Sequence, residues 1–113
     1  CCGAPLEVVS GCVAPTQAIL RRNKLSPSHV DVFAIHEPFA ATIVKLQREL
    51  EIDSARLNIN GGCIALGHPM GATGAIMTGT AIDELKRCDG SIGVIAASGA
   101  AGSGSALLVE RCY

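Results

Sequence analysis

The sequence predicts a layered α/β domain, in which helices cover a mixed sheet of parallel strands with an antiparallel strand at its C-terminal end. Short apolar runs alternate with segments whose apolar residues recur at helical spacing, a pattern typical of separate strand and helix layers. The last two apolar runs are joined only by residues 98–104, and strands joined so briefly pair antiparallel. The 113 residues are 49% hydrophobic and 17% charged, which predicts one folded domain over residues 1–113.

The N-terminal part of the chain predicts a strand, a helix and a second strand. Residues 6–10 have the composition of a short strand. Pro15 suits the first position of a helix that runs to about Lys24. A turn is expected at residues 25–28, and residues 30–35 then read as a buried strand.

A second helix is expected to begin near Pro38. Its apolar side chains recur at helical spacing with charged residues between them, so one face is predicted to pack in the core. This predicted core stripe consists of Phe39, Ile43, Leu46 and Leu50.

The C-terminal half of the chain predicts a loop, a helix and two strands. The glycine-rich loop before about Met70 leads into a helix that ends near Arg87 and that Gly79 weakens. Residues 92–97 and 105–111 are the expected strands, and the glycine-rich residues between them connect them.

Charge and cysteine usage exclude several classes of function. A net charge of -1 gives no attraction to nucleic acid or to an acidic membrane surface, and no apolar run reaches the roughly 20 residues of a membrane span. The six cysteines lack the C-x-x-C spacing of a zinc site or a redox dithiol, so no metal is expected. Scattered thiols without a signal peptide favour an intracellular location, cytoplasmic or organellar (mitochondrial or peroxisomal), over secretion. The chain begins at Cys1 without methionine and is interpreted as a piece of something longer.

Three polar residues are expected at the ends of strands or before helices. His36 and Ser98 each follow a predicted strand, and His68 precedes the helix after the glycine-rich loop. Sites in open α/β sheets gather beyond the carboxyl ends of strands, so these three side chains are expected in one pocket. Pro69 and the neighbouring glycines restrict the backbone around His68 and aim its ring. Imidazoles beside glycine-loop N–H groups suit acid–base and oxyanion chemistry at a carbonyl.

Two motifs resemble those of the thiolase family. Residues 58–74 read N-x-N-G-G-x-I-A-x-G-H-P-x-G-A-T-G, which resembles the histidine motif of thiolases. Residues 36–40, His-Glu-Pro-Phe-Ala, resemble their Asn/His-Glu-Ala-Phe motif, and the resemblance extends over residues 11–110. It implies the C-terminal half of a thiolase, a subunit of two similar halves that passes an acyl group through a cysteine between coenzyme A thioesters. The implied partners are an N-terminal thiolase half, an acyl-CoA substrate and further subunits of a homo-oligomer, and no cofactor beyond the coenzyme A thioester is implied.

The resemblance also implies roles for individual residues. His68 would activate the nucleophilic cysteine as general base and help to hold the thioester oxygen, and His36 would lie in the oxyanion hole with a bound water. Histidine at position 36 points toward the fatty-acid-oxidation and sterol-carrier-like branches. The other implied site residues are Gly99 and Ala100 in the oxyanion loop, and Phe39 and Gly67 in substrate binding.

Two departures from the family pattern bear on activity. Ser98 stands where the second catalytic cysteine would be, and a hydroxyl titrates far above a thiol's pKa of about 8.5, so it is a poor base for proton removal at carbon. The nucleophilic cysteine belongs to the N-terminal half. Cys63 is expected to pack against backbone instead of taking that role, so this chain alone is expected to be inactive in thiolysis.

Two other interpretations remain open. Ser98 favours a degenerate thiolase-fold module that binds acyl-CoA or a partner subunit without turnover. The glycines of residues 67–74 or 99–104 resemble a phosphate-cradling loop, but residues 99–104 lead into a strand near the C-terminus, unlike a nucleotide-binding loop that opens a helix.

Overall fold

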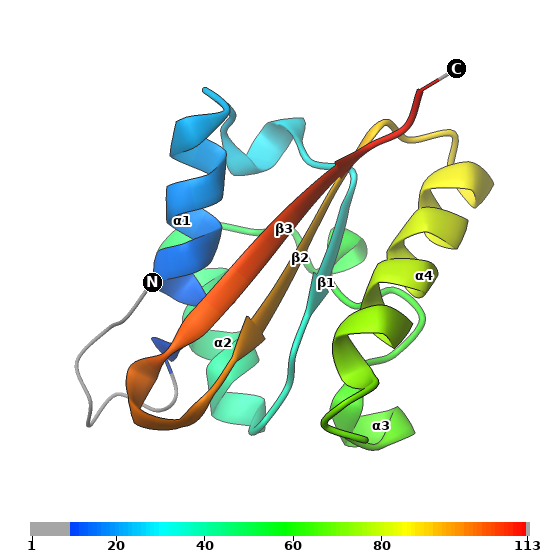
Figure 1. Ribbon diagram of the computed structural model, residues 1–113. Helices are drawn as coiled ribbons and strands as arrows, with labels where there is room; N and C mark the ends of the chain where they lie inside the picture. The colour runs from blue at the N-terminus through cyan, green and yellow to red at the C-terminus, as the bar shows by residue number, and fades with distance from the viewer. Residues whose placement is uncertain (1–9, 113) are drawn as a thin grey trace.

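A three-stranded sheet forms the centre of the molecule (Figure 1). The computed structural model describes residues 10–112. Strand β1 (Val32–Ile35) pairs in parallel with β2 (Ile92–Ser98), and β3 (Gly104–Glu110) pairs antiparallel with β2. The mixed sheet confirms the predicted fold class and the direction of its last strand.

Helices cover both faces of this sheet (Figure 1). Helices α1 (Val13–Arg22) and α2 (Ala40–Leu50) lie against one face, and α4 (Thr73–Arg87) lies against the other. A four-residue helix, α3 (Cys63–Leu66), forms inside the glycine-rich segment that was expected to be a loop. Short 3-10 helices at Pro27–His29, Ser54–Arg56 and Ala100–Gly102 connect these elements.

The core has two parts because successive strand side chains point to opposite faces of a sheet. Phe33 and Ile35 of β1 pack with the α1 and α2 side chains, such as Leu46. Val32 and Ala34 face the other way and pack with α4. The sheet therefore fixes α1, α2 and α4 in position independently on its two sides.

The helix starts differ from the sequence-based boundaries. Helix α1 begins at Val13, two residues before Pro15, because the first N–H groups of a helix have no partner within the helix and a proline costs little there. Helix α2 begins at Ala40, and Phe39 before it has an extended backbone. The prediction that Phe39 belongs to the core is therefore wrong: its side chain leaves the stripe and is 57% exposed.

The start of α4 also differs from its sequence-based boundary. Helix α4 begins at Thr73 instead of near Met70, since Ala72 N–H bonds to the Pro69 carbonyl in a turn that precedes the helix. Met70 is exposed. The strand predicted at residues 6–10 lies outside the described residues except for Ser10, which is not in a strand.

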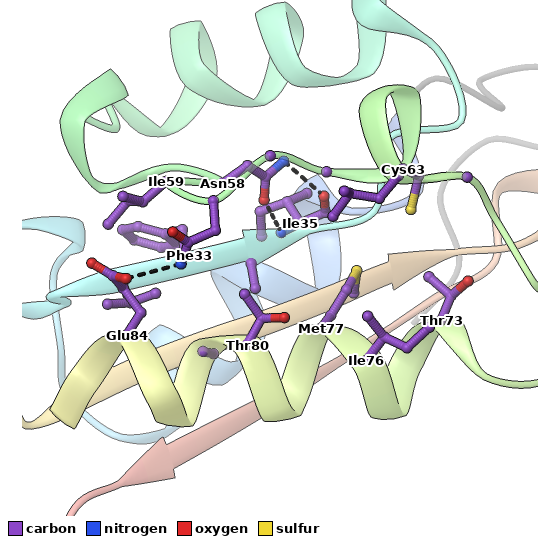
Figure 2. Close-up of a pocket in the computed structure, with 18 of the residues that line it drawn as sticks. Phe33, Ile35, Asn58, Ile59, Cys63, Thr73, Ile76, Met77, Thr80 and Glu84 are labelled. Atoms are coloured by element: carbon purple, nitrogen blue, oxygen red, sulfur yellow. Dashed lines mark hydrogen bonds between the residues drawn. The ribbon is translucent and has the colours of Figure 1, made fainter. Parts of the chain in front are cut away.

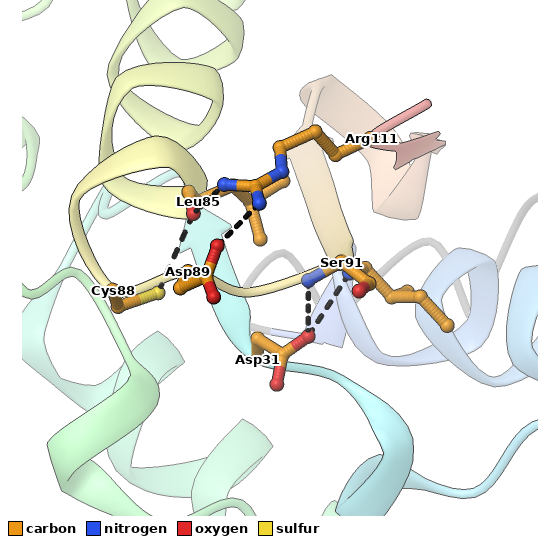
Figure 3. A network of polar contacts seen from close by, with 7 residues as sticks. Asp31, Leu85, Cys88, Asp89, Ser91 and Arg111 are labelled. Atoms are coloured by element: carbon orange, nitrogen blue, oxygen red, sulfur yellow. Dashed lines mark hydrogen bonds and ion pairs between the residues drawn. The ribbon is translucent and has the colours of Figure 1, made fainter. Parts of the chain in front are cut away.

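A polar network fixes the end of the sheet that lies farthest from the site described below (Figure 3). The Asp31 carboxylate accepts hydrogen bonds from the backbone N–H groups of Ser91 (2.8 Å) and Ile92 (3.0 Å). The bond from Ile92 is the main cause that lowers the pKa of Asp31. Arg111 donates to the Leu85 carbonyl and pairs with Asp89, which ties the end of β3 to the end of α4.

Among residues 10–112, no helix combines the length and apolarity needed to cross a membrane.

Candidate active site

His36 directly follows β1. Its N–H bonds to the Ala96 carbonyl at 2.8 Å, so the parallel pairing with β2 continues one residue past the strand. The side chain is 4% exposed, and its Nε2 atom has no hydrogen-bond partner among the described residues. The sheet therefore holds a buried imidazole with one ring nitrogen free for a ligand.

Asn58 closes the outer edge of β1 next to His36 (Figure 2). Its backbone N–H donates to the Phe33 carbonyl. Its side-chain amide continues the strand-like hydrogen bonding, because it accepts from the Ile35 N–H (2.8 Å) and donates to the Ile35 carbonyl (3.0 Å). A side-chain amide has the donor and acceptor of a peptide group, so Asn58 replaces a neighbouring strand at that point. It adopts φ of 47°, a conformation that asparagine tolerates.

Glu37 connects this edge to the segment that carries the second histidine. Its carboxylate accepts from Asn58 Nδ2 (2.6 Å) and from the Ile64 N–H (3.1 Å). A Cβ atom on Gly62 would collide with this carboxylate, which explains glycine at that position. The bonds to Glu37 hold α3 against the end of β1.

His68 lies between α3 and α4, after Gly67, which has φ of 90°. Its Nδ1 is 2.8 Å from the Thr73 hydroxyl, and that hydroxyl also donates to the Pro69 carbonyl at 3.1 Å. The first residue of α4 thus orients an imidazole that is otherwise exposed. Since Nδ1 is engaged, Nε2 is the nitrogen available for chemistry.

The two imidazoles lie face to face. Their ring centroids are 4.3 Å apart with planes tilted by 36°. Burial, and then the nearby His68 ring, lower the pKa of His36, so its neutral form predominates near neutral pH. The expectation that these histidines share one site agrees with this geometry.

Ser98 ends β2 beside His36. Its hydroxyl is 3.1 Å from His36 Nδ1, so it fixes the orientation of the buried ring. The Gly99 N–H, expected in an oxyanion hole, donates to the Ser103 carbonyl at 2.9 Å. This bond leaves the Ala100 N–H as the candidate donor of that loop.

Cys12 contributes a thiol that interacts with Ser98. It is fully buried, and burial raises the pKa of the Cys12 thiol to about 11, although a hydrogen bond with Ser98 acts in the opposite direction. A neutral, buried thiol is not a nucleophile.

Cys63 occupies a position that the motif alone did not predict. The expectation was packing against backbone, and the side chain does pack on the apolar cluster beneath α4. Its sulfur, however, also lies with a ring nitrogen of each histidine in a group of three atoms within 4.8 Å of one another. The sequence signal for this contact is weak, since Cys63 is five residues before His68 and a turn of α3 intervenes.

A cavity of about 90 Å³ lies between β1, the segment 58–67 and α4 (Figure 2). Gly67 lines it, but Phe39 and the two imidazoles do not. Ligand pockets are usually about 300–1,000 Å³, so this cavity is too small for an acyl-CoA.

The fold and the site together define a layered α/β domain that presents two neighbouring imidazoles beyond the carboxyl ends of parallel strands. Comparison with known proteins identifies its family. Residues 2–111 match the family described as "Thiolase, C-terminal domain". The chain belongs to the thiolase family, as its C-terminal domain.

Several relatives show how much of a thiolase this chain represents. It is 43% identical over 110 residues to the β-ketoadipyl-CoA thiolase of Pseudomonas knackmussii, covering 96% of this chain and 27% of the relative. The peroxisomal 3-ketoacyl-CoA thiolase A of Candida tropicalis is 41% identical over 112 residues, covering 96% and 26%. The crystal structure of human mitochondrial 3-ketoacyl-CoA thiolase in complex with CoA superposes with a TM-score of 0.96 at 31% identity, covering 100% of this chain and 29% of that one. The chain spans little more than a quarter of the length of these relatives.

Proposed function

We propose that this chain supplies the histidine pair of a thiolase-type acyltransferase that acts on coenzyme A thioesters, in thiolysis of a 3-ketoacyl-CoA or in the reverse condensation. The observation that carries the proposal is the pair of facing imidazoles, each fixed at Nδ1 by a hydroxyl. Membership of the thiolase family supports the reaction class.

His68 is the general base in this proposal. The Thr73 hydroxyl engages Nδ1, which leaves Nε2 to take the proton of a cysteine thiol supplied by the N-terminal half. In the condensation, the resulting thiolate attacks the thioester carbonyl, the C–S bond breaks, and coenzyme A leaves as its thiol. In thiolysis, the thiolate attacks the 3-keto carbonyl, the C2–C3 bond breaks, and acetyl-CoA leaves after its C2 atom takes up the proton that the thiol lost. Both directions form an acyl-enzyme. A positioned base of this kind contributes about 10²- to 10⁴-fold to the rate.

His36 stabilises the oxyanion. In the tautomer in which the Ser98 hydroxyl donates to Nδ1, Nε2 carries the ring proton and can donate it to the thioester oxygen. The buried location strengthens this hydrogen bond, and a low pKa keeps the ring neutral when His68 takes up a proton. The Ala100 N–H is the proposed second donor.

An N-terminal thiolase half is the proposed partner of this chain. Near the site, Ile64, Leu66 and Met70 are 63%, 64% and 84% exposed. On the sheet face that carries α4, Leu107 of β3 is 47% exposed, because α4 packs on β1 and β2. Exposed apolar side chains in this number suit an interface that the second half of the subunit covers.

The wider setting is proposed from the relatives. They include a peroxisomal thiolase and a mitochondrial one, which supports an intracellular, organellar location for the complete protein. A homo-oligomer of complete subunits is proposed on the same ground of family membership.

Ser98 favours a second candidate function, a module that binds acyl-CoA or a partner subunit without turnover. In the structure the hydroxyl holds His36, as a positioning residue would. It cannot serve as a carbon base at neutral pH, because its pKa is far above that of a thiol. Binding without turnover would follow if the reaction requires that base.

The test is coenzyme A-dependent cleavage of acetoacetyl-CoA by the complete protein. We expect activity in the wild type, a loss of about 10²- to 10⁴-fold in His68→Ala, and no loss in His29→Ala, whose ring caps an exposed 3-10 helix. Activity only in Ser98→Cys would establish a degenerate site on an intact scaffold. Equal activity in wild type and His68→Ala would contradict the proposed base, and silence of both wild type and Ser98→Cys would favour the binding module.

A further inference from the structure

The geometry points to a metal-binding site at His36, Cys63 and His68, with three protein ligands and one open position, for a Zn²⁺-class cation. The three donor atoms, one from each residue, lie within 4.8 Å of one another. Two imidazoles and a thiolate are the donor set that Zn²⁺ and its neighbours prefer. No metal was expected from the sequence, because it has no C-x-x-C spacing. The fold instead brings the three ligands together from three separate segments.

The buried His36 ring gives independent support for a ligand. Its Nε2 atom is buried without a hydrogen-bond partner among the described residues, and such an atom costs free energy unless something binds it. The side chain is 96% buried, the complement of its 4% exposure, so rotation into solvent does not satisfy the atom. A cation held between the rings would satisfy it.

The hydroxyls next to the two rings suit metal ligation by both histidines. A ligating histidine usually engages its other ring N–H with an oxygen, which fixes the tautomer. His36 Nδ1 has the Ser98 hydroxyl at 3.1 Å and His68 Nδ1 has the Thr73 hydroxyl at 2.8 Å. A hydroxyl both donates and accepts, so each can accept the Nδ1 proton and leave the Nε2 lone pair for the metal.

The distances require a small closure. Zn–N bonds of about 2.05 Å and a Zn–S bond of about 2.3 Å put tetrahedral donor atoms about 3.5 Å apart. His36 is fixed by the sheet, whereas His68 is exposed and Cys63 half-buried. Side-chain rotation of Cys63 and His68 can bring the donors to this spacing while the backbone of β1 stays in place.

Metal binding displaces the thiol proton of Cys63 and changes no oxidation state. The Cys63 S–H proton passes to solvent as the Zn–S bond forms, and both imidazoles bind in their neutral forms. The thiolate reduces the net charge of the centre to about +1. Nearby Glu37, whose charge acts on His36, further favours a cation at this position.

A metal at this site would occupy the Nε2 atoms of both imidazoles. The proposed acyl transfer uses the same two atoms, so the ion would compete with the acyl thioester and inhibit turnover. This consequence rests on the proposed function, whereas the metal site itself does not. Cys63 would then act as the residue that makes the histidine pair sensitive to metal.

The test is titration of the metal-free complete protein with Co²⁺ alone, followed by competition with Zn²⁺. We expect one saturable site per chain with a sulfur-to-metal charge-transfer absorption that Zn²⁺ abolishes. Cys63→Ala should lose that absorption and bind at least about 100-fold more weakly, because even the loss of a residue that only hydrogen-bonds a metal ligand costs about 10- to 100-fold. The matched control is Cys88→Ala, since Cys88 is exposed and lies outside the cluster.

The outcomes separate the site from the proposed function. Loss of the absorption in both Cys63→Ala and Cys63→Ser, with retention in Cys88→Ala, supports the site and excludes a folding defect specific to one variant. Equal binding by Cys63→Ala and wild type, or no saturable binding by wild type, overturns it. In the acetoacetyl-CoA assay, Zn²⁺ should inhibit wild type at least about 100-fold more strongly than Cys63→Ala. A wild type without turnover would contradict the proposed function and leave the Co²⁺ result decisive for the metal site.

Discussion

Asn58→Ala is the substitution that should most clearly separate the two halves of the candidate site. Its side chain makes three hydrogen bonds, two to the backbone of Ile35 and one to Glu37. At about 1 kcal/mol each, their loss costs about 3 kcal/mol. Alanine at φ of 47° adds about 1–2 kcal/mol of strain, because a Cβ-bearing residue without a polar side chain disfavours that conformation.

This cost should appear as local opening at the edge of β1. A loss of about 3 to 5 kcal/mol corresponds to roughly 10²- to 4 × 10³-fold faster exchange, at about 1.4 kcal/mol per factor of ten. The assay is amide hydrogen exchange by mass spectrometry on the complete protein, read on peptides covering residues 33–37 and 58–64. The Ile35 amide is the most informative probe, because its N–H bonds directly to Asn58.

Asn23→Ala is the matched control for this experiment. Asn23 also donates a side-chain hydrogen bond to a backbone carbonyl, that of Ile19 at 2.8 Å, but it is exposed and has φ of -97°. We expect no change in residues 33–37 or 58–64. Exchange in Asn58→Ala within about threefold of wild type would refute the assigned role, since that is only about 0.7 kcal/mol. An equal increase in Asn23→Ala would show that the effect is not local to the edge.

Two further predictions test the orientation of His68 and the far end of the sheet. Thr73→Val should lower thiolytic activity about 10- to 100-fold by releasing His68 Nδ1, whereas Thr73→Ser should keep the activity. The control is Thr78→Val, which removes a hydroxyl bonded within the same helix and should leave the activity unchanged. A loss of activity in Thr73→Ser as severe as in Thr73→Val would contradict the role of the hydroxyl. Asp31→Asn should lower the free energy of unfolding at pH 7. Backbone N–H groups at the start of β2 hold the pKa of Asp31 in the folded state below its usual value of 3.8, and the stability that this gives is lost when Asp31 is protonated. The difference in unfolding free energy between Asp31→Asn and wild type should therefore shrink as the pH falls below 3.8. Urea unfolding from pH 7 to pH 2 checks this, with Asp83→Asn at an exposed ion pair as the control, and a difference that stays constant with pH would show that the Asp31 charge contributes nothing.

Periodicity sufficed to predict α1, α2, α4 and the described strands, because burial dominates those elements, and the short connection between the last two strands predicted the mixed sheet. The side chains of β1 alternate between the two parts of the core, and the apolar face of α2 packs in one of them. Both features result from the burial of apolar side chains away from water. The same reasoning failed at Phe39, where the helix had not yet begun and the helical spacing no longer gave the direction of the side chain. Helix α3 was missed because four residues between glycines carry too little periodicity to be recognised.

Some features of the candidate site were predicted from the sequence and others were not. His36, His68 and Ser98 were predicted together because each follows a strand or precedes a helix, and the direction of the sheet determines where those ends meet. The position of Asn58 was not predicted, because its role depends on which edge of β1 lacks a neighbouring strand, a property of the folded sheet alone. Cys63 was missed for a related reason, since α3 turns its sulfur back toward histidines 27 residues before and 5 residues after it, by their numbering.

Ser98 shows why a changed residue can preserve a site and still alter its chemistry. Geometry at the site depends on hydrogen bonds to ring nitrogens, and a hydroxyl at 3.1 Å makes such a bond to His36. Proton removal from carbon depends instead on a thiolate, and a hydroxyl does not ionise at neutral pH. A serine at this position therefore keeps His36 oriented, so the imidazole pair persists whether the complete protein turns over acyl-CoA or only binds it. For the same reason the oriented rings remain available to a metal when Cys63 supplies the thiolate that Ser98 lacks.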